Sequence, residues 1–497
     1  MTDAAYDELK AKFKRIAAIG DAAGVLHWDM AVTMPAGAAP GRAEQLATLK
    51  LLSHETLTDP RLGELMAKTD ADALQPWDRA NLREMKRSRA HAAAAPAKLV
   101  EALSKASSAC EMTWREARPA NDFAAVKPLL TEVLKLTREL AQAKGEALKL
   151  SPYDALLDQY EPGGRAEKID ALFTELEREL PPLLFAAIDR QDANPPPPKP
   201  KGPFPQDVQK AVGERFMQAA GFDFKRGRLD VSHHPFCGGA TGDIRITTRY
   251  DQDDFASALM GVLHETGHAL YDLGLPQSWR GQPVGEARGM VLHESQSLLL
   301  EMQACRSEDF LSWAAPILRR AFGGKASDPA WKVEALYANA IRVERGFIRV
   351  DADEVTYPAH VLLRYRLERS LIGGDLKVDD LPGAWMDGFE KLMGVRPPDD
   401  RRGCLQDIHW FDGAFGYFPT YTLGAIAAAQ IFAAAKAAVP EIPQSLRKGD
   451  FKPLMTWLRT KIHRAASSGS TDGILKSATG ETLNVKPFLS HLRARYL

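Results

Sequence analysis

The sequence predicts a mostly helical protein with one small β-sheet. Segments before residue 190 and after residue 253 place apolar residues three and four positions apart with charged residues between them, as in 167–188 (EKIDALFTELERELPPLLFAAI). This spacing is typical of amphipathic helices. Strict alternation of polar and apolar residues occurs at 243–247 (DIRIT), which is the two-residue period of a strand. Helices therefore dominate, and the sheet is a minor insert.

The predicted elements follow one another along a single unit, residues 1–497. Residues 1–193 form a helical N-terminal region. The proline-rich stretch 194–205 (NPPPPKPKGPFP) cannot continue a helix because proline lacks the amide hydrogen and clashes with the preceding turn, so we expect a surface loop there. The second region, 206–497, begins with a helix near 206–220, continues with a β-hairpin or short sheet made of 227–236 and 243–250, separated by Gly238, Gly239 and Gly242, and returns to helices from 253 onward.

Composition argues against nucleic acid and membranes as partners. The 64 Lys and Arg residues nearly balance the 65 Asp and Glu residues, and the net charge is −1, so no attraction to a polyanion or an acidic membrane surface is expected. The longest apolar stretch begins at Leu423 (LGAIAAAQIFAAAKAAV) and is interrupted by Gln430 and Lys436. It falls short of a membrane span, and we expect a buried helix.

Cysteine usage and the first residues favour a cytoplasmic protein. The four cysteines are scattered and show no spacing typical of a zinc knuckle or a disulfide framework; they are Cys110, Cys237, Cys305 and Cys404. Residues 1–15 (MTDAAYDELKAKFKR) mix charges throughout and lack the apolar core that a signal peptide needs. We therefore expect reduced thiols and a chain that stays in the cytoplasm.

Residues 263–274 (LHETGHALYDLG) carry two histidines four positions apart on a predicted helix. Three aspartates at 251–254 precede this stretch, where a helix start favours acidic and capping residues, and it ends in glycine. His264 and His268 then project from one face and can bind one ion, while Glu265 can take a proton from a water molecule at that ion. Chance is the alternative, but the mid-helix position favours a zinc site.

The third metal ligand has to come from another segment, because a catalytic zinc usually takes three protein ligands and one water. No HxxGxxH pattern follows His268, so a glutamate on a second helix is expected. Glu294 is the best candidate because its segment (VLHESQSLLLEMQ, 291–303) carries an apolar stripe, where an unpaired buried carboxylate is costly. Glu286 and Glu301 are weaker candidates, and the alternative places Glu294 on a solvated face.

The sequence resembles the carboxypeptidase Taq family of zinc metallocarboxypeptidases in six short signatures that occur in order. They are HPF (His234–Phe236), DxRxT (Asp243–Thr247), HExxH (His264–His268), HES (His293–Ser295), IRxxAD (Ile348–Asp353) and GxxQDxHW (Gly403–Trp410). Three further stretches match as well, namely HWDMAVTMP from His27, YDALLDQYEPG from Tyr153 and PFLSHLRARYL from Pro487. The resemblance therefore spans essentially the whole chain.

The resemblance implies a large helical fold like those of neurolysin and angiotensin-converting enzyme, with a deep cleft and a small sheet near the active site. It implies one Zn²⁺ per chain, with Co²⁺ possible, bound by His264, His268 and Glu294 in the catalytic region 206–497. It also implies a homodimer that hydrolyses the C-terminal peptide bond of peptides. Glu265 would act as the general base.

Donors for the oxyanion of the reaction are expected in the stretch IHWFDGAFGYFPTY (408–421). A tetrahedral oxyanion needs hydrogen-bond donors that face it from the side opposite the metal. By likeness to related helical peptidases we favour Tyr421 with His409, and Tyr417 is a further candidate. A packing role is the alternative for each tyrosine.

Recognition of a terminal carboxylate calls for a guanidinium that binds it through two hydrogen bonds. Arg349 is the first candidate and Arg245 the second, although Asp351 or Asp353 could pair with Arg349 instead. Around them, Asp243 and Thr247 are expected either to align the peptide backbone or to brace Arg245. Further expected residues of the site are His234 and Gln406, which would line the cleft, and Asp407, which would orient His409.

Two other functions compete with a carboxypeptidase. An oligopeptide endopeptidase of the neurolysin type would share the metal site but ignore the terminal carboxylate. A non-catalytic helical protein that binds peptides would not need Glu265. The signatures favour the carboxypeptidase.

Overall fold

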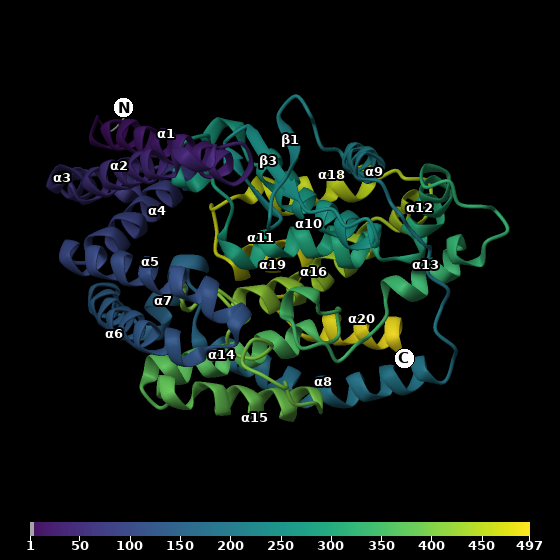
Figure 1. Ribbon diagram of the computed structural model, residues 1–497. Helices are drawn as coiled ribbons and strands as arrows, with labels where there is room; N and C mark the ends of the chain where they lie inside the picture. Colours follow the sequence, from purple (N-terminus) through teal and green to yellow (C-terminus); the bar gives the residue numbers. More distant parts are fainter. Residues whose placement is uncertain (1–3) are drawn as a thin grey trace.

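The computed structural model describes residues 4–497, which form a mostly helical protein with one three-stranded sheet (Figure 1). The helices before the proline-rich stretch are α1 (Ala4–Val32), α2 (Ala39–Thr58), α3 (Pro60–Lys68), α4 (Pro76–Ala93), α5 (Ala97–Ala120), α6 (Phe123–Leu148), α7 (Pro152–Tyr160) and α8 (Ala166–Asp192). Residues 194–205 form neither helix nor strand, as the density of proline predicts.

The rest of the chain returns to helices after the sheet. It contains α9 (Gln206–Ala220), α10 (Phe255–Gly274), α11 (Gly289–Leu298), α12 (Glu308–Ala321), α13 (Val333–Ala340), α14 (Tyr357–Gly373), α15 (Leu381–Met393), α16 (Pro419–Ala438), α17 (Ile442–Leu446), α18 (Lys452–Lys461), α19 (Thr471–Thr479) and α20 (Lys486–Tyr496). A π-helix, η5 (Leu299–Cys305), continues directly from α11. The expected predominance of helix with a small sheet is confirmed.

Of the two predicted alternatives, a β-hairpin or a short sheet, the structure has a short sheet. Its strands are β1 (Gly227–Val231), β2 (Phe236–Ala240) and β3 (Asp243–Thr248), in the order β1-β3-β2. β2 and β3 form an antiparallel hairpin, with Gly238 opposite Arg245, whereas β1 runs parallel to β3. Gly238 and Gly239, which we expected to separate the strands, are themselves part of β2. The turn between β2 and β3 therefore lies at residues 241–242. Gly242 has a φ of 83°, a conformation that favours glycine.

The first helices bring the N-terminal region onto this sheet. α1, α3 and α4 share a small core of their own, in which Leu9, Leu65 and Met85 are fully buried, and these helices lie together at one end of the molecule (Figure 1). Gly24 of α1 faces the backbone carbonyl of Gly239 so closely that a methyl group at position 24 would collide with it. The close approach places Trp28, also on α1, against the arginines of the sheet.

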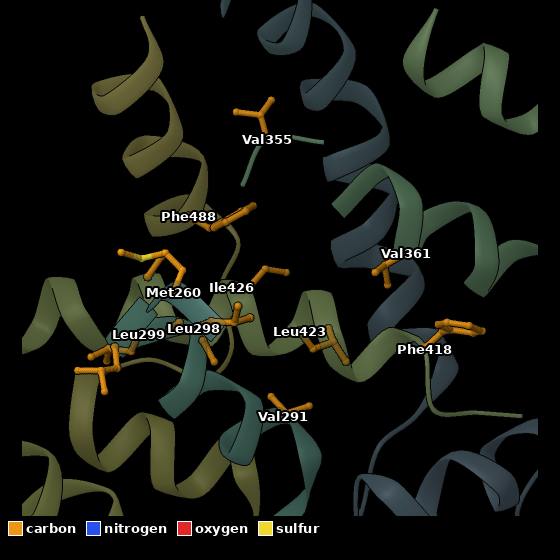
Figure 2. Packing of buried hydrophobic residues seen from close by; sticks show 14 of the residues in the cluster. Met260, Val291, Leu298, Leu299, Val355, Val361, Phe418, Leu423, Ile426 and Phe488 are labelled. Carbon is orange, nitrogen blue, oxygen red and sulfur yellow. The ribbon is translucent and has the colours of Figure 1, made fainter. Parts of the chain in front are cut away.

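The main core is built around α16 and α11, which pack side by side near the centre of the molecule. Figure 2 shows Val291 and Leu298 of α11 beside Leu423 and Ile426 of α16, with Phe488 of α20 above them. All five side chains are buried, and full burial of such a side chain stabilises the fold by about 1.5–3 kcal/mol. This packing fixes α11 and α16, the two helices that later carry residues of the site.

The apolar stretch from Leu423 is part of α16, as the interruption by Gln430 and Lys436 predicted. Among residues 4–497, α16 is the one helix long and apolar enough to cross a membrane by length and composition, and most of its surface is buried inside the protein. Gln430 is buried and its side-chain amide donates to Thr479 Oγ1 (2.8 Å) and to the Thr482 carbonyl (3.0 Å). The helix is a core element.

Two fully enclosed carboxyl groups make stability depend on pH. Burial raises the pKa of Glu161 and of Glu368 from 4.5 to about 7. Between these values the folded chain keeps protons that the unfolded chain releases, so the free energy of unfolding falls as the pH rises from about 4.5 to about 7, by about 3 kcal/mol for each group.

We therefore expect Glu368→Gln, which cannot titrate, to lose less stability than the wild type between pH 5 and pH 8. Urea unfolding at the two pH values measures the difference, which should be about 2.5 kcal/mol. Equal losses in both proteins would show that Glu368 titrates normally in the fold.

Candidate metal centre

Helix α10 carries the two histidines in the predicted way. Its N-cap is Asp254, whose carboxylate accepts hydrogen bonds from the backbone amides of Ala256 (2.9 Å) and Ser257 (3.3 Å). The helix begins at Phe255 and ends at Gly274. His264 and His268 lie one turn apart on a face directed at α11, with ring centroids 5.1 Å apart.

Glu294 of α11 completes the group. Its Oε1 lies 3.8 Å from Nε2 of His264 and its Oε2 lies 3.5 Å from Nε2 of His268. One ligand atom from each residue lies within 4.8 Å of the others. Ligands bound at 2.0–2.2 Å to a tetrahedral ion are about 3.4 Å apart, so two imidazoles and a carboxylate at these distances fit a divalent metal of the zinc type.

Glu301, a weaker candidate for the third ligand, lies behind His264. Its Oε2 accepts a hydrogen bond from Nδ1 of His264 (2.9 Å), and its Oε1 accepts one from Nη2 of Arg306 (2.8 Å). Burial would raise the pKa of Glu301, but Arg306 and His264 outweigh it and lower the pKa. Because Nδ1 of His264 donates to this carboxylate, Nε2 is left to face the metal position. Glu286, the other weaker candidate, is exposed.

His268 is held in a comparable way by His293, which the HES signature contributes. Their Nδ1 atoms are 2.6 Å apart, and Nε2 of His293 lies 3.3 Å from Oδ1 of Asp272. With Nε2 of His268 directed at Glu294, its Nδ1–H donates to Nδ1 of His293, whose Nε2–H donates to Asp272. The spacing of the sequence did not reveal these partners of the histidines.

Two glycines allow the helices of the site to approach one another. A methyl group on Gly267, inside the HExxH stretch, would lie 2.5 Å from Cα of Ser297 on α11. A methyl group on Gly424 of α16 would lie 2.6 Å from Cβ of Glu294. Real Cβ atoms do not come this close to other atoms, so α10, α11 and α16 can cross at the metal site only with glycine at these two positions.

Gly267→Ala is therefore expected to destabilise the protein by about 3 kcal/mol, because the backbone of α11 has to move away. Gly261→Ala is the matched control on the same helix: its methyl group would meet nothing nearer than Oγ1 of Thr248 at 3.9 Å, so we expect an unchanged or slightly raised stability. Thermal unfolding of both variants compares them. Equal effects would contradict the close crossing.

Glu265 directly follows His264, one of the three candidate ligands, and is 8% exposed. Burial raises its pKa to about 7, helped by the charges of Glu294 and Glu301 and opposed by His264. A carboxylate with this pKa can both accept and return a proton near neutral pH. The group has the properties of a general base.

Residues 409–421, which we call the donor loop, run into the first turn of α16, the helix whose Gly424 packs against Glu294. Nε2 of His409 lies 3.2 Å from the hydroxyl of Tyr421, and the rings of Tyr417 and Tyr421 pack edge to face at 5.1 Å. Burial raises the pKa of Tyr421 to about 12, and burial together with Arg349 lowers the pKa of His409 to about 4. The tyrosine therefore stays protonated and the histidine neutral. Nδ1 of His409 is buried without a partner among residues 4–497.

Arg349 links the donor loop to the IRxxAD signature. Its Nε and Nη2 both donate to Oδ1 of Asp407 (3.0 and 2.9 Å), and its guanidinium lies 4.8 Å from the centre of the Tyr421 ring. Nη1 reaches the hydroxyl of Tyr357 at 3.4 Å. Sequence reasoning missed Tyr357, because a tyrosine at the start of a helix gives no pattern of its own.

Asp407 does not form the expected hydrogen bond with His409. Its second oxygen accepts from Nε of Arg364 (2.6 Å), so two arginines hold it and lower its pKa against the effect of burial. Gln406 is also used within the protein: its Oε1 accepts from the Arg349 backbone amide and its Nε2 donates to the Phe347 carbonyl. Both residues join the IRxxAD and GxxQDxHW stretches. Asp351 and Asp353, named as alternative partners of Arg349, form no ion pair with it.

The second arginine candidate lies at the sheet. Arg245 pairs with Asp243 (2.7 Å) and stacks 4.2 Å above the ring of Trp28. Thr247 is fully buried, and its hydroxyl accepts from Ser232 Oγ (2.7 Å) and from the Phe236 amide (3.1 Å), which favours bracing of the sheet over contact with a peptide. His234 is exposed on the loop between β1 and β2.

Known proteins are similar to this chain over almost its whole length. The family model for carboxypeptidase Taq (M32) metallopeptidases matches residues 8–496. The chain belongs to this family. It is 38% identical to thermostable carboxypeptidase 1 of Thermus thermophilus, over 99% of this chain and 98% of the relative, and 36% identical to thermostable carboxypeptidase 1 of Pyrococcus furiosus, with the same coverage. The solved structure of Trypanosoma cruzi metallocarboxypeptidase 1 superposes with a TM-score of 0.97 at 38% identity and full coverage of both chains.

Membership in the M32 family settles the class of reaction. The protein is a metallocarboxypeptidase, a peptide hydrolase that uses a divalent metal. Peptides are its substrates. The predicted carboxypeptidase is confirmed, and the endopeptidase and the non-catalytic peptide-binding protein are not supported.

Proposed function

We propose that the protein is a zinc carboxypeptidase that holds one Zn²⁺ through His264, His268 and Glu294. The observation that carries the proposal is the convergence of these three side chains, with Nε2 of each histidine within 4 Å of the Glu294 carboxylate. When bound, a zinc ion polarises the scissile carbonyl and makes a water molecule more acidic. Co²⁺ has similar ligand preferences and is expected to replace it.

Glu265 accepts the proton of the attacking water and passes it to the leaving amine. Its burial beside His264 suits both transfers, since the same carboxyl group has to act first as a base and then as an acid. Glu265 directly follows His264 on α10 and is therefore close to the proposed metal position.

Tyr421 donates a hydrogen bond through its hydroxyl group to the developing oxyanion and keeps its proton. His409 supports this role because its Nε2–H donates to the oxygen of Tyr421, which orients the hydroxyl hydrogen away from the histidine. Tyr417 packs on Tyr421 and limits its movement.

Arg349 recognises the terminal carboxylate of the peptide. Support for Arg349 over Arg245 comes from its place beside the donor loop, where it stacks on Tyr421 and contacts Tyr357. Both arginines already pair with a carboxylate, Arg349 with Asp407 and Arg245 with Asp243, so the place beside the donor loop is what favours Arg349. Asp243 and His234 remain candidates for contacts with the rest of the peptide, while Gln406 and Thr247 position other residues.

A pair of peptides that differ in the terminal group tests this assignment. We expect a peptide amidated at its C-terminus to be cleaved about 100-fold more slowly than the free acid, because a hydrogen bond to a charged group is lost. Arg349→Lys should reduce that preference, and Arg245→Lys should keep it, with kcat/KM as the readout. A preference lost only in the Arg245 variant would transfer the role to Arg245.

The same proposal extends to the whole molecule. We propose a cytoplasmic homodimer whose protomer has the neurolysin-like architecture with a deep cleft, divided into the helical region 1–193, the loop 194–205 and the catalytic region 206–497. The scattered, reduced cysteines support the compartment. Light scattering behind a sizing column tests the dimer, for which twice the chain mass of 54.6 kDa is expected.

A further inference from the structure

The stretch Tyr153–Gly163 (YDALLDQYEPG) has no part in the chemistry above. It lies between two parts of the site, the donor loop and helix α11. It forms most of α7 and the turn that follows. One end of it contacts the donor loop, and the other contacts the first turn of α11, the helix that carries Glu294. Most of its residues are buried.

The donor loop rests directly on α7. Gly416 has a φ of 87°, and a methyl group there would lie 2.8 Å from the backbone nitrogen of Leu157, so backbone meets backbone at this point. The ring of Tyr160 packs edge to face on Tyr417, with centroids 5.0 Å apart at an angle of 89°.

Glu368 of α14 ties α7 to the donor loop through its carboxyl group. Its Oε1 accepts a hydrogen bond from the hydroxyl of Tyr153, and its Oε2 accepts one from Nε1 of Trp410 (3.2 Å). The backbone amide of Gly416 also donates to it. Among residues 4–497, no cation is a hydrogen-bond partner of Glu368, and the residue is fully buried. A buried carboxylate without a cation lowers the stability of the fold when it is ionised. We therefore assign Glu368 a different role, which is to hold the donors of α7 and the donor loop together.

Glu161, directly after α7, makes the corresponding link to the metal-ligand helix. Its Oε2 accepts from the backbone amide of Val291 (3.0 Å), one turn before Glu294, and its Oε1 accepts from the hydroxyl of Thr471. Gly289 makes room for the carboxylate: it has a φ of 59°, and a methyl group on it would lie 2.5 Å from Oε2 of Glu161. Val291 N–H is one of the amides that a helix start leaves without a partner in its own helix.

We propose that the segment Tyr153–Glu161, together with Glu368, sets the position of the donor loop relative to the metal-ligand helix α11. Glu368 is the positioning residue for the loop, and Glu161 is the positioning residue for Glu294. The inference rests on the proposed roles of Tyr421 and Glu294, and it adds the element that holds them at a fixed separation.

The first test compares Glu368→Ala with Glu368→Gln. Alanine leaves Trp410 N–H and Gly416 N–H without an acceptor, so the loop shifts, and kcat is expected to fall about 30- to 100-fold while KM and zinc affinity change less than about threefold. Glutamine keeps an oxygen for these donors and turns its amide toward the hydroxyl of Tyr153, so kcat should stay within about threefold of the wild type.

The second test compares Glu161→Ala with Glu161→Gln by competition for Zn²⁺ with a chromophoric chelator. Alanine frees the first turn of α11, and zinc affinity is expected to fall about 10- to 100-fold, as when a supporting residue of a metal ligand is lost. At saturating zinc, kcat should recover to within about threefold. Glutamine should preserve the affinity.

Glu368→Ala should lower kcat but not zinc affinity, whereas Glu161→Ala should lower zinc affinity but not kcat at saturating zinc. This opposite pattern distinguishes a positioning role from a general loss of stability. Gln159→Ala is the matched control in the same segment, because Gln159 is exposed and its side-chain amide contacts Lys144 and the Leu156 carbonyl rather than the donor loop or α11. We expect it to lower thermal stability without changing kcat or zinc affinity. The inference would be overturned if all three variants lost both kcat and zinc affinity. It would also be overturned if both alanine variants kept wild-type kcat and zinc affinity. If Tyr421→Phe leaves kcat unchanged, the proposed oxyanion donor fails instead.

Discussion

Glu265→Gln is expected to lower kcat by about 10³-fold, because the positioned proton acceptor contributes about 10²- to 10⁴-fold to such reactions. The amide has nearly the shape of the carboxylate but cannot take up a proton at neutral pH. Since Glu265 is not a ligand in the group His264, His268 and Glu294, zinc should bind the variant as tightly as the wild type.

The control for this result is the folded, metal-loaded state of the variant. Zinc content and the thermal unfolding midpoint should match the wild type, so that the loss belongs to the chemical step. KM for a free-acid peptide should change little, because the residue binds no part of the substrate in the ground state. A variant that retains more than about a tenth of the wild-type kcat would exclude Glu265 as the general base.

Glu294→Ala is expected to reduce zinc affinity by more than about 10²-fold, since it removes one of three protein ligands, whereas loss of a supporting residue costs about 10- to 100-fold. Activity at low zinc should vanish and return only in part at high zinc. Glu301→Gln is the matched comparison. It keeps an oxygen that can accept from Nδ1 of His264, so its loss should be about 10-fold at most.

Chelator competition with both purified variants measures these affinities directly. The order expected is wild type, then Glu301→Gln, then Glu294→Ala. If the Glu301 variant lost more affinity than the Glu294 variant, Glu301 would be the ligand and Glu294 the supporting residue.

Local patterns predicted the helices and the pair of histidines because both depend on neighbours in the chain. The cap of α10, the four-residue spacing of His264 and His268, and the buried stripe around Glu294 are all set within one or two turns. The structure agrees with each of them. The interrupted apolar stretch of α16 was interpreted correctly for the same reason.

Long-range packing decided what the sequence could not predict. β1 pairs in parallel with β3, and the glycines at 238 and 239 are strand residues because they pair with Arg245 and Ile244 of β3. α1 packs closely on the carbonyl group of Gly239. Asp407 is drawn to Arg349 and Arg364, both of which come from segments more than 40 residues away. His293 and Tyr357 join the site only because α11 and α14 fold against α10 and α16.

Gly267 in HETGH is a further residue whose identity depends on long-range packing. The spacing of the histidines requires nothing of position 267, and any good helix former would satisfy the pattern. Its glycine follows from the crossing with α11, where Ser297 leaves no room for a methyl group. The physical reason lies in the partner helix.

Anomalous diffraction at the zinc absorption edge, from crystals of the zinc-loaded protein, tests the metal centre most directly. We expect one strong peak per chain, about 2.0–2.2 Å from Nε2 of His264, Nε2 of His268 and a carboxylate oxygen of Glu294. A peak bound through Glu301 or His293, or no peak beside Glu294, would contradict the proposed zinc site and the roles assigned around it.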